Sequence, residues 1–448
     1  MPGCSQECLR KPTLILSSEV ELLMNGNSHY ALVDCNNFFV SCERVFNPAL
    51  ESKPVIVLSN NDGCVVARSQ EVKNMAIPMG IPLFKVKEKL ASANVQIFSS
   101  NFVLYADMSA RVLKVLSNFS GEIEPYSIDE SFLKVKGMND KQLNSWGKEI
   151  VHTVKQWTGI PVSVGIGPTR TLAKFSNHVA KKQPQYQGVY NCADCSLDYW
   201  MKRYPVEEVW GIGRKLALKC HHAHIDTVYD LKHVDLHWAK KYLDTVGTRT
   251  VMELRGEECI LTTVPAKRGS VIRSRSFDPP IEEFESLYRR IALFVATAAE
   301  KLREYKMCAK AFTIFVMSSR FIRDNYYGSV PVLLDRATDN TVEMLKLSRE
   351  ALSKIYRQGV LYKKGGVVME KLVPRDAVQI PLNDPVPYSF QKRTAKIVYA
   401  LDDVNKKLGQ NVVKLGSYSM INKTTDKKEM ISKRFTTHWP DIPVVKAK

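Results

Sequence analysis

Two adjacent carboxylates, Asp129 and Glu130, lie within the otherwise apolar residues 126–132 (YSIDESF) and constrain this chain more than any other feature. A buried carboxylate without a compensating cation costs on the order of several kcal/mol, so such a pair is expected to hold one. A third candidate, Asp34, ends the apolar run at residues 30–33 far upstream. Hard cations such as Mg²⁺ prefer carboxylate oxygens together with substrate phosphates. The pattern therefore indicates a divalent-metal site built on a sheet.

The acidic pair alone leaves a second interpretation open. In a regular strand, Asp129 and Glu130 point to opposite faces, so both reach one site only at a bend, a bulge or a strand end. A surface turn that happens to carry two acids is an equally good explanation of the pair. The position of Asp34 at the end of a strand favours the metal site.

Charge indicates a polyanionic partner. The chain has 448 residues, which predicts two to four domains, with a net charge of +18 and a pI near 9.3. Nucleic acid is the leading partner and an anionic membrane surface the minor one.

Compartment and membrane signals point inside the cell. No apolar run approaches the roughly 18 residues that a membrane span needs. The apolar patch at 14–24 is interrupted by Glu19 and Glu21, unlike a signal peptide. Ten cysteines without disulfide-framework spacing fit a reducing cytoplasm. Residues 220–224 (CHHAH) suggest zinc only weakly, because no partner pair lies at finger-like spacing.

Alternating strands and helices predict an α/β or α+β core up to about residue 190. A helical region over 205–258 and a mixed region follow, and the last 70 or so residues are rich in lysine and interrupted by proline. The clearest expected elements are strands at 30–33, 54–58, 161–166, 311–317 and 365–370, and helices at 103–118, 140–157, 169–182 and 283–305.

Residues 162–174 are typical of a strand, a glycine turn and a helix start. The N-terminus of a helix presents free N–H groups, which suits a phosphate, although this is neither a Walker loop nor a dinucleotide fingerprint. Lys174 and Lys181 are seven apart and share one helix face. A solvated basic face explains that spacing equally well.

Residues 209–216 (VWGIGRKL), with 225–231 downstream, are typical of a helix-hairpin-helix. Gly211 and Gly213 would present backbone N–H groups to a DNA phosphate, and the basic Arg214 and Lys215 follow. The alternative is a pair of glycine helix caps.

The strand-end acid, the acidic pair, the basic helix and the hairpin follow one another along the chain. A sequence with these motifs in this order resembles the Y-family translesion DNA polymerases, and within them the UmuC-type branch. The resemblance covers residues 29–448 and is strongest before 280. Residues 1–28 fall outside the family pattern and are expected to be a loosely ordered extension, with Met24 as an alternative start. The segments that carry it are 34–39 (DCNNFF), 58–68 (LSNNDGCVVAR), 105–109 (YADMS), 126–132 (YSIDESF), 209–213 (VWGIG) and 273–277 (RSRSF).

The resemblance implies a multidomain α+β fold shaped like a right hand. The implied parts are a palm at 29–38 and 101–190, fingers at 39–100, a thumb with the helix-hairpin-helix at 191–265, a little finger at 266–374 and a C-terminal tail at 375–448.

It also implies template-directed nucleotidyl transfer with two Mg²⁺ ions, held by Asp34, Asp129 and Glu130 with help from the carbonyl of Cys35. In such a site, one ion activates the primer 3′-hydroxyl and the other holds the triphosphate.

The resemblance further assigns a nucleotide pocket. Phe39 falls at the steric-gate position, where an aromatic ring excludes a ribose 2′-hydroxyl, although an ordinary core aromatic explains it too. Gln70 stands where many relatives have tyrosine, which weakens a contact at that position. The implied dNTP-binding residues are Phe38, Phe39, Lys73 and Lys181. Small residues at Cys64 and Val66 would form the roof over the templating base and leave room for damage, or they simply pack.

Primer-template DNA is the implied partner, with contacts from Gly211, Gly213, Arg214, Lys215, Arg273 and Arg275. Gln379 and Leu382 resemble a sliding-clamp peptide, although Asn383 replaces the usual aromatic, and a proline-broken linker is the alternative. Relatives contact the UmuD′ dimer and the RecA filament near the C-terminus. An apolar stripe there fits a partner surface or a core equally well; it consists of Ile397, Leu401, Val404 and Leu408.

These expectations describe a cytoplasmic, error-prone translesion polymerase of the SOS response that has no membrane partner. Two alternatives are a catalytically silent DNA-binding accessory protein of the same fold and a helix-hairpin-helix glycosylase. The intact acidic triad argues against the first alternative, and the mixed α/β surroundings of the hairpin argue against the second.

Overall fold

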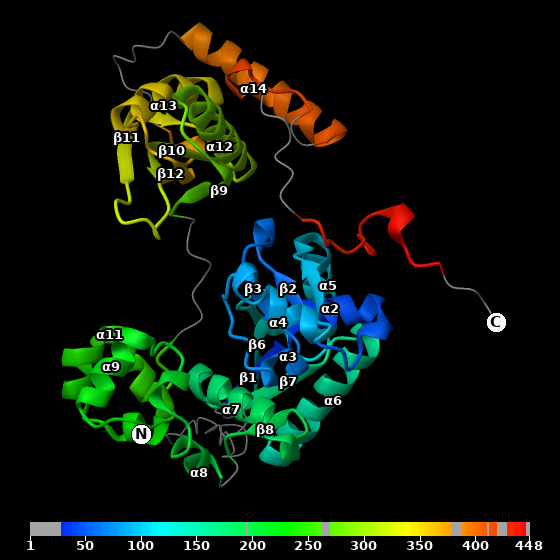
Figure 1. The fold of residues 1–448 in the computed structure, drawn as a ribbon. Coiled ribbons are helices and arrows are strands. Elements are labelled where there is room, and N and C mark those ends of the chain that lie inside the picture. The colour runs from blue at the N-terminus through cyan, green and yellow to red at the C-terminus, as the bar shows by residue number, and fades with distance from the viewer. Residues whose placement is uncertain are drawn as a thin grey trace, which may run out of the picture. The chain divides into compact units, whose positions relative to one another are not determined.

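The computed structural model describes residues 28–193, 196–260, 269–378, 388–409, 412–418 and 428–444 (Figure 1). The chain divides into two compact units. Unit 1 comprises Met1–Thr262 and Asp426–Lys448, and unit 2 comprises Thr263–Thr425. The expected extension at 1–28 lies, except for its last residue, outside the described residues.

A five-stranded sheet forms the centre of unit 1. Its order is β5-β6-β1-β7-β8, so the strand that ends near Asp34 is the middle one. All neighbours are antiparallel except β7 and β8. The strands are β1 (His29–Cys35), β5 (Glu122–Pro125), β6 (Glu130–Val135), β7 (Val162–Gly167) and β8 (Val189–Asn191).

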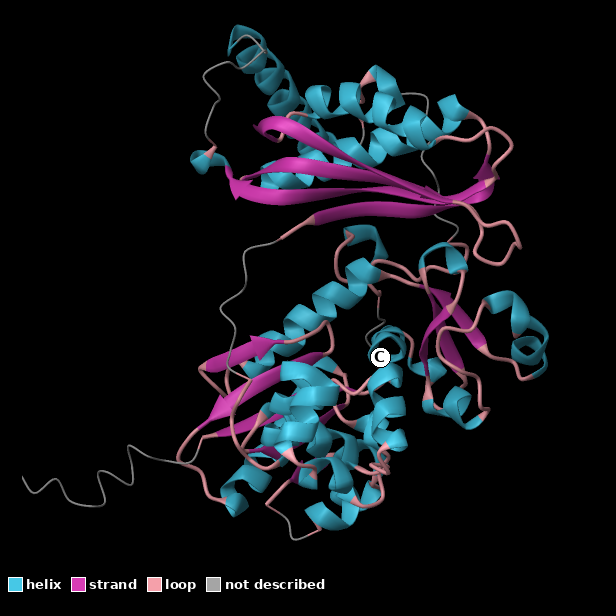
Figure 2. Cartoon of the chain, turned by 90° about the vertical axis from the view of Figure 1, so that its left-hand side faces the viewer, coloured by secondary structure: helices cyan, strands magenta, loops and turns pink. Residues whose placement is uncertain are grey.

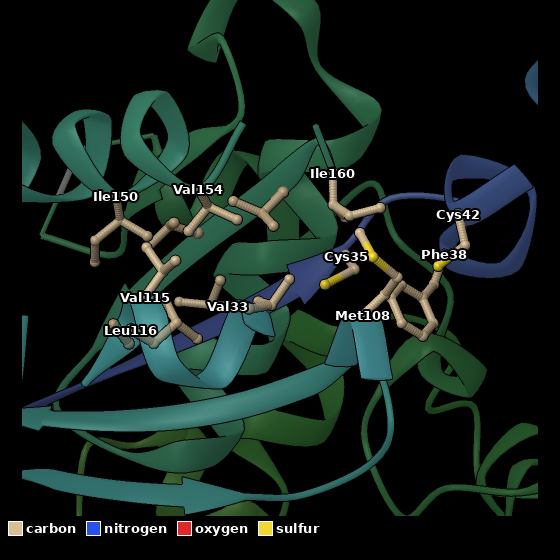
Figure 3. Packing of buried hydrophobic residues seen from close by; sticks show 14 of the residues in the cluster. Val33, Cys35, Phe38, Cys42, Met108, Val115, Leu116, Ile150, Val154 and Ile160 are labelled. Carbon is tan, nitrogen blue, oxygen red and sulfur yellow. The ribbon is translucent and has the colours of Figure 1, made fainter. Parts of the chain in front are cut away.

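Helices cover both faces of this sheet. Alternate residues of β1 point to opposite faces. Val33 and Cys35 pack with α5 (Phe102–Leu116) and α6 (Asp140–Thr158) in the main hydrophobic core (Figure 3). Tyr30 and Leu32 point the other way, toward α7 (Arg170–Lys182), where they pack with Ala173. The expected helices at 103–118, 140–157 and 169–182 are confirmed to within two residues at each end.

Helix α7 approaches the sheet closely over the glycines of β7, and the approach is closest at Gly165. A Cβ at Gly165 on β7 would lie 1.9 Å from the backbone nitrogen of Asn177 and 2.3 Å from the carbonyl oxygen of Ala173. Only a residue without a side chain fits there, so Gly165 determines how near the lysines of α7 come to β1.

A smaller three-stranded sheet follows β1 and α2 (Phe38–Phe46) in the chain. Its order is β3-β2-β4, with β2 and β4 parallel. Apolar residues of its strands pack with those of the neighbouring helices in a separate hydrophobic cluster. Its elements are β2 (Val55–Leu58), β3 (Val65–Arg68), α3 (Gln70–Asn74), α4 (Lys87–Ser92) and β4 (Gln96–Ser99).

The region after β8 is helical, as expected. Its apolar residues pack with those of α7 in a separate hydrophobic cluster. The helices are α8 (Leu197–Met201), α9 (Arg214–His222), α10 (Val228–His233) and α11 (Leu236–Leu254). Two of these helices are capped at their N-termini by a side-chain oxygen, α10 by Thr227 and α11 by Asp235. Thr169 caps α7 in the same way.

Unit 2 is an antiparallel sheet with its helices on one side (Figure 2). The order β11-β10-β12-β9 and the chain sequence β-α-β-β-α-β describe a split βαβ motif. Its elements are β9 (Val271–Ile281), α12 (Phe284–Glu304), β10 (Met307–Met317), β11 (Tyr327–Thr338), α13 (Thr341–Ile355) and β12 (Tyr362–Pro374).

The expected tail at 375–448 does not fold as one body. Helix α14 (Tyr388–Leu408) belongs to unit 2, where Asp402 forms an ion pair with Arg303 and Thr394 accepts a hydrogen bond from Asn340. Residues 428–444 belong to unit 1. Within the described residues, no helix combines the length and apolar character that crossing a bilayer requires.

Candidate active site

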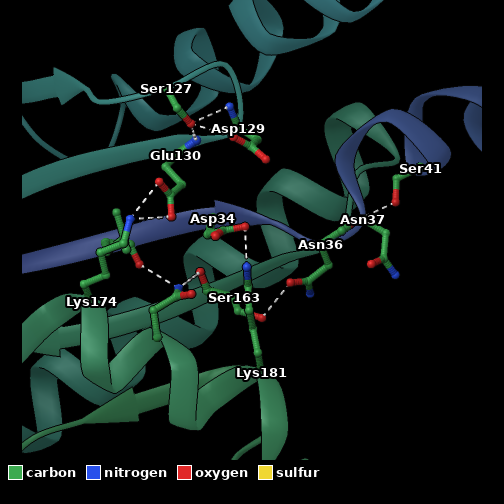
Figure 4. Close-up of polar contacts among 12 residues, drawn as sticks. Asp34, Asn36, Asn37, Ser41, Ser127, Asp129, Glu130, Ser163, Lys174 and Lys181 are labelled. Carbon is green, nitrogen blue, oxygen red and sulfur yellow. Dashed lines mark hydrogen bonds and ion pairs between the residues drawn. The ribbon is translucent and has the colours of Figure 1, made fainter. Parts of the chain in front are cut away.

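The register of β1 and β6 brings two of the three predicted acids together. Asp34 and Glu130 are directly opposite each other on neighbouring strands, so their side chains share one face of the sheet (Figure 4). Asp129 immediately precedes β6, and its carbonyl accepts the N–H of Cys35 at 2.9 Å. The acidic pair is therefore at a strand end, which is the geometry that a common site for both acids requires.

Two lysines of α7 face these carboxylates. The Lys181 Nζ lies 2.5 Å from the Asp34 Oδ1, and the Lys174 Nζ lies 2.8 and 2.9 Å from the two oxygens of Glu130. The interpretation of Lys174 and Lys181 as a purely solvated basic face is therefore wrong. Their common helix face is turned toward the acids at the sheet.

Burial dominates the electrostatics of Asp34. The pKa of its carboxyl is raised from 3.8 to about 7, mainly by desolvation; the Lys181 ammonium opposes the rise, and the nearby Glu130 and Asp129 add to it. A carboxylate that is buried beside two other acids is stabilised by added positive charge. Burial also raises the pKa of the Cys35 thiol, so the neutral thiol persists and only the carbonyl of Cys35 is suited to a hard cation.

In this conformation the acids are bound to groups of the protein itself. Asp129 accepts the hydroxyl of Ser127 at 2.5 Å, while Lys174 and Lys181 hold the other two. Across the part of the chain that the structure describes, no group of three or more His, Cys, Asp or Glu side chains is arranged to hold a metal. The donor set nevertheless fits Mg²⁺, because it consists of carboxylates and one of them is buried with a raised pKa.

A set of asparagines supports the site, and the sequence interpretation missed it. Asn36 Oδ1 accepts the hydroxyl of Ser163, and the Asn177 amide donates to the carbonyls of Leu32 and Ser163. Asn37 adopts a left-handed conformation (φ 49°) at the start of α2. The signal was present in the sequence, since two asparagines directly follow Cys35, the last residue of β1.

The predicted nucleotide residues differ in their exposure. Phe38 is only 4% exposed and packs in the core, whereas Phe39 is half-buried, with its ring stacked on Tyr105 at 4.5 Å. The Lys73 Nζ donates to Asn37 Oδ1 at 2.6 Å. Burial lowers the pKa of Lys73, as do the charges of Lys181 and other nearby cations. The shared positive charge of Lys73 and Lys181 suits a polyphosphate.

Cys64 immediately precedes β3 and Val66 is its second residue, and both are half-buried. Cys64 forms an isolated antiparallel bridge with Pro82, and its N–H donates to the Ser59 hydroxyl. Their side chains are therefore neither fully packed nor fully exposed.

The interpretation of the start of α7 as a phosphate site is wrong. The N–H of Thr171 donates to the Glu253 carboxylate at 2.9 Å, and the N–H of Leu172 donates to the Thr169 hydroxyl. Glu253, on α11, is fully buried. The protein thus places its own anion where a phosphate would bind.

The predicted hairpin is present with one difference. Gly211 has φ 92°, which favours glycine, and Gly213 caps the N-terminus of α9, while Arg214 and Lys215 are exposed. The segment before the hairpin is a 3₁₀ turn (Val206–Glu208) and not the α-helix that the motif predicts.

The predicted residues of unit 2 and the tail are only partly described. Arg273 and Arg275 lie on β9, one of the two edge strands of the sheet. Gln379 and Leu382 lie outside the described residues. In the apolar stripe of α14, Ile397 and Leu408 are 49% and 69% exposed, so the core interpretation of the stripe is wrong for them.

Comparison with known proteins agrees with this geometry. The sequence model of the impB/mucB/samB family matches residues 33–178, its C-terminal domain matches 268–382, and a domain of unknown function matches 395–445. The chain is 38% identical to Protein UmuC of Salmonella typhimurium over 93% of its own length and 100% of the relative. It is 36% identical to Protein ImpB of the same species over 93% and 99%.

This chain belongs to the impB/mucB/samB family. A solved Y-family DNA polymerase chimera, Dbh-Dpo4(243-245)-Dbh, has a similar fold, with a TM-score of 0.61 at 19% identity over 77% of this chain and 99% of that one. The chain is a UmuC-like Y-family polymerase, a class of error-prone translesion enzymes that generally use a divalent metal. The glycosylase alternative is wrong, because the chain belongs to this polymerase family and the helices around the hairpin are part of a unit that is built on a five-stranded sheet.

Proposed function

We propose that this polymerase adds deoxynucleotides opposite damaged template bases in the SOS response, with Asp34, Asp129 and Glu130 as ligands of two Mg²⁺ ions. The observation that supports this most is the cross-strand pairing of Asp34 with Glu130, with Asp129 bonded through its backbone to Cys35. The Lys181 ammonium offsets only part of the cost of burying Asp34, since the pKa of this carboxyl stays raised, and a divalent cation would offset the rest.

The protein side of this chemistry is positioning and charge balance. When bound, the metal ions would activate the primer 3′-hydroxyl and neutralise charge on the triphosphate. Without them, Lys181 and Lys174 balance the charge of Asp34 and Glu130. Lys181 and Lys73 are near enough to influence each other, so an incoming triphosphate would meet both cations.

The Phe39 ring is proposed as the steric gate. It is half-buried and held against Tyr105, so its exposed part is fixed in place. A rigid ring beneath the sugar rejects a 2′-hydroxyl by contact. Cys64 and Val66, both small and half-buried, are proposed as the roof over the templating base. Phe38 is proposed as a further residue of the nucleotide pocket.

The parts of the right-hand fold are proposed from the order of the sheets and helices along the chain. The five-stranded sheet would be the palm (29–38 and 101–190), the three-stranded sheet the fingers (39–100), the helices α8–α11 the thumb (191–265), and the sheet of unit 2 the little finger (266–374). Primer-template DNA would contact the hairpin and the arginines of β9.

The proposed partners are the UmuD′ dimer, the RecA filament and, through Gln379 and Leu382, a sliding clamp, all within the cytoplasm. The exposed Ile397 and Leu408 on α14 support a partner surface on that helix. A labelled peptide of residues 375–390 that shows no affinity for the clamp would remove that partner.

Primer extension on undamaged template tests the site assignment. Asp34→Ala and the double variant Asp129→Ala/Glu130→Ala should lose extension and keep most of their DNA affinity, measured by fluorescence anisotropy. Asp107→Asn serves as a control, because this acid pairs with Arg111 one helical turn away on α5. Extension by the double variant at the wild-type rate would refute the assignment.

A further inference from the structure

The C-terminal segment of the chain completes unit 1. Residues 395–445 match a domain of unknown function, yet α14 packs within unit 2 whereas 428–444 pack within unit 1. Ser99, at the end of β4, forms a parallel bridge with Ile431, and its N–H donates to the carbonyl of Met430 at 3.0 Å. Phe435 stacks on Phe46 of α2, with ring centroids 4.8 Å apart and planes within 5°. We call residues 428–435 the strap.

Polar contacts fix the strap to the first turn of α5. The buried Asn101 caps this helix by accepting the N–H of Leu104. The amide of Asn101 also donates to the carbonyls of Ser432 and Lys433, both at 3.2 Å, and lies 3.0 Å from the Ser432 hydroxyl. One side chain therefore holds both the helix and the strap. In addition, the Lys428 Nζ lies 5.7 Å from the centre of the Phe102 ring.

A second contact runs through a buried carboxylate. The Ser432 hydroxyl donates to the Glu43 Oε1 at 3.0 Å, and the same oxygen accepts the Tyr105 hydroxyl at 2.6 Å. Glu43 is only 2% exposed, and burial raises the pKa of its carboxyl. Glu43 thus joins the strap, α2 and α5 at one point.

These contacts lead to the ring of Phe39. That ring stacks on Tyr105 at 4.5 Å and 14°, and meets the ring of Phe102 edge-on at 6.0 Å and 82°. Both neighbours lie in the first turn of α5, the turn that the strap holds. A continuous series of contacts therefore links the Phe39 ring to Ser432, a residue almost 400 positions later in the chain.

We propose that the strap is a specificity-determining element that positions the Phe39 ring and so sets the discrimination between deoxyribo- and ribonucleoside triphosphates. This inference rests on the proposed role of Phe39 as the steric gate. A gate acts by contact with a single hydroxyl, and a misplacement of about 1 Å at a reacting centre can cost roughly 100-fold. Ser432 and Glu43 are positioning residues, because they act on the nucleotide through Tyr105 and Phe39.

The test uses the full chain with Ser432→Ala and its conservative partner Ser432→Thr. Thr437→Ala is the matched control, because it removes a hydroxyl from an exposed position in the same C-terminal segment. The ratio of kcat/KM for dNTP over rNTP is measured by single-nucleotide incorporation. A second readout is the thermal stabilisation by each nucleotide of the complex with a dideoxy-terminated primer.

We expect Ser432→Ala to lower the sugar selectivity roughly 3- to 10-fold, which corresponds to the loss of its hydrogen bond to Glu43. The Asn101 amide, which also loses the Ser432 hydroxyl, keeps its two carbonyl acceptors in the strap. Ser432→Thr should restore the selectivity, and Thr437→Ala should match the wild type. Tyr105→Phe keeps the ring and removes the hydroxyl that Glu43 accepts, so it should lower the selectivity to a similar degree. Because both act through Glu43, the double variant should lose less than the product of the two single effects.

Phe39→Ala separates the strap inference from the gate assignment. If Phe39→Ala loses selectivity while Ser432→Ala and Tyr105→Phe keep the wild-type ratio, the strap inference is overturned and the gate stands. Fully multiplicative effects in the double variant would also overturn it. If Phe39→Ala itself keeps the wild-type ratio, the gate assignment fails. Should Ser432→Ala fail to fold, as shown by thermal unfolding, Tyr105→Phe alone decides between these outcomes.

Discussion

Replacing Asp34 by asparagine should stabilise the metal-free protein while it removes a proposed metal ligand. In the wild type, burial moves the pKa of this carboxyl from 3.8 to about 7. The folded state therefore binds more protons than the unfolded state between these two values, and stability falls as the pH rises through that window. Asparagine has no such titration and keeps an oxygen that can accept from Lys181.

The magnitude follows from the pKa values. At about 1.4 kcal/mol for each pH unit, the ionised carboxylate destabilises the fold by at most about 4 kcal/mol above pH 7. Loss of the ion pair with Lys181, whose side chain is partly exposed, reduces the net gain. We expect Asp34→Asn to exceed the wild type in free energy of unfolding by about 1–3 kcal/mol at pH 8 in EDTA. The difference should vanish near pH 4.

The assay is urea denaturation of both proteins from pH 4 to 8.5, with and without Mg²⁺. Mg²⁺ at 100 times its Kd should stabilise the wild type by about 2.7 kcal/mol and the variant by much less. Asp107→Asn, which removes a carboxylate from a partly exposed ion pair, should show neither effect. An Asp34→Asn protein no more stable than the wild type at pH 8 without Mg²⁺ would refute the reasoning.

Three further predictions concern packing, nucleotide binding and DNA affinity. Gly165→Ala should destabilise unit 1 by at least about 3 kcal/mol in urea denaturation, because its Cβ would meet the backbone of α7; Gly121→Ala, which has open space, is the control, and equal stability of the two would contradict the packing argument. Lys73→Ala should raise the KM for dNTPs with a smaller effect on kcat, and an unchanged KM would remove Lys73 from the triphosphate site. DNA affinity should fall with salt by a slope of about −0.9 for each phosphate neutralised; a flat dependence would mean that the net charge of +18 is not a DNA footprint.

Local sequence patterns were sufficient for the elements and for the candidate acids. An apolar run such as the one before Asp34, and helical periodicity such as that of 103–118 and 140–157, are formed by residues close together in the sequence. The structure has the corresponding strand and helices close to the expected bounds. The strand-end position of Asp129 and Glu130 also follows from a local conflict, since two charges cannot continue a buried strand.

What the sequence could not give depends on distant contacts. The start of α7 was expected to bind a phosphate, but Glu253 occupies it from a helix some 80 residues later. Lys174 and Lys181 could be placed on one helix face, yet their pairing with Glu130 and Asp34 required the close approach at Gly165. Nothing local to residues 428–444 indicated that they pack on unit 1 and not with the rest of the expected tail.

Primer extension past an abasic site tests the central claim most directly. It compares the wild type with Asp129→Ala/Glu130→Ala in Mg²⁺, each alone and with the UmuD′ dimer and activated RecA filament added. The account predicts extension past the lesion by the wild type and none by the double variant, with similar DNA affinity. Bypass by the double variant, or no synthesis by the wild type under any of these conditions while DNA binding persists, would contradict it.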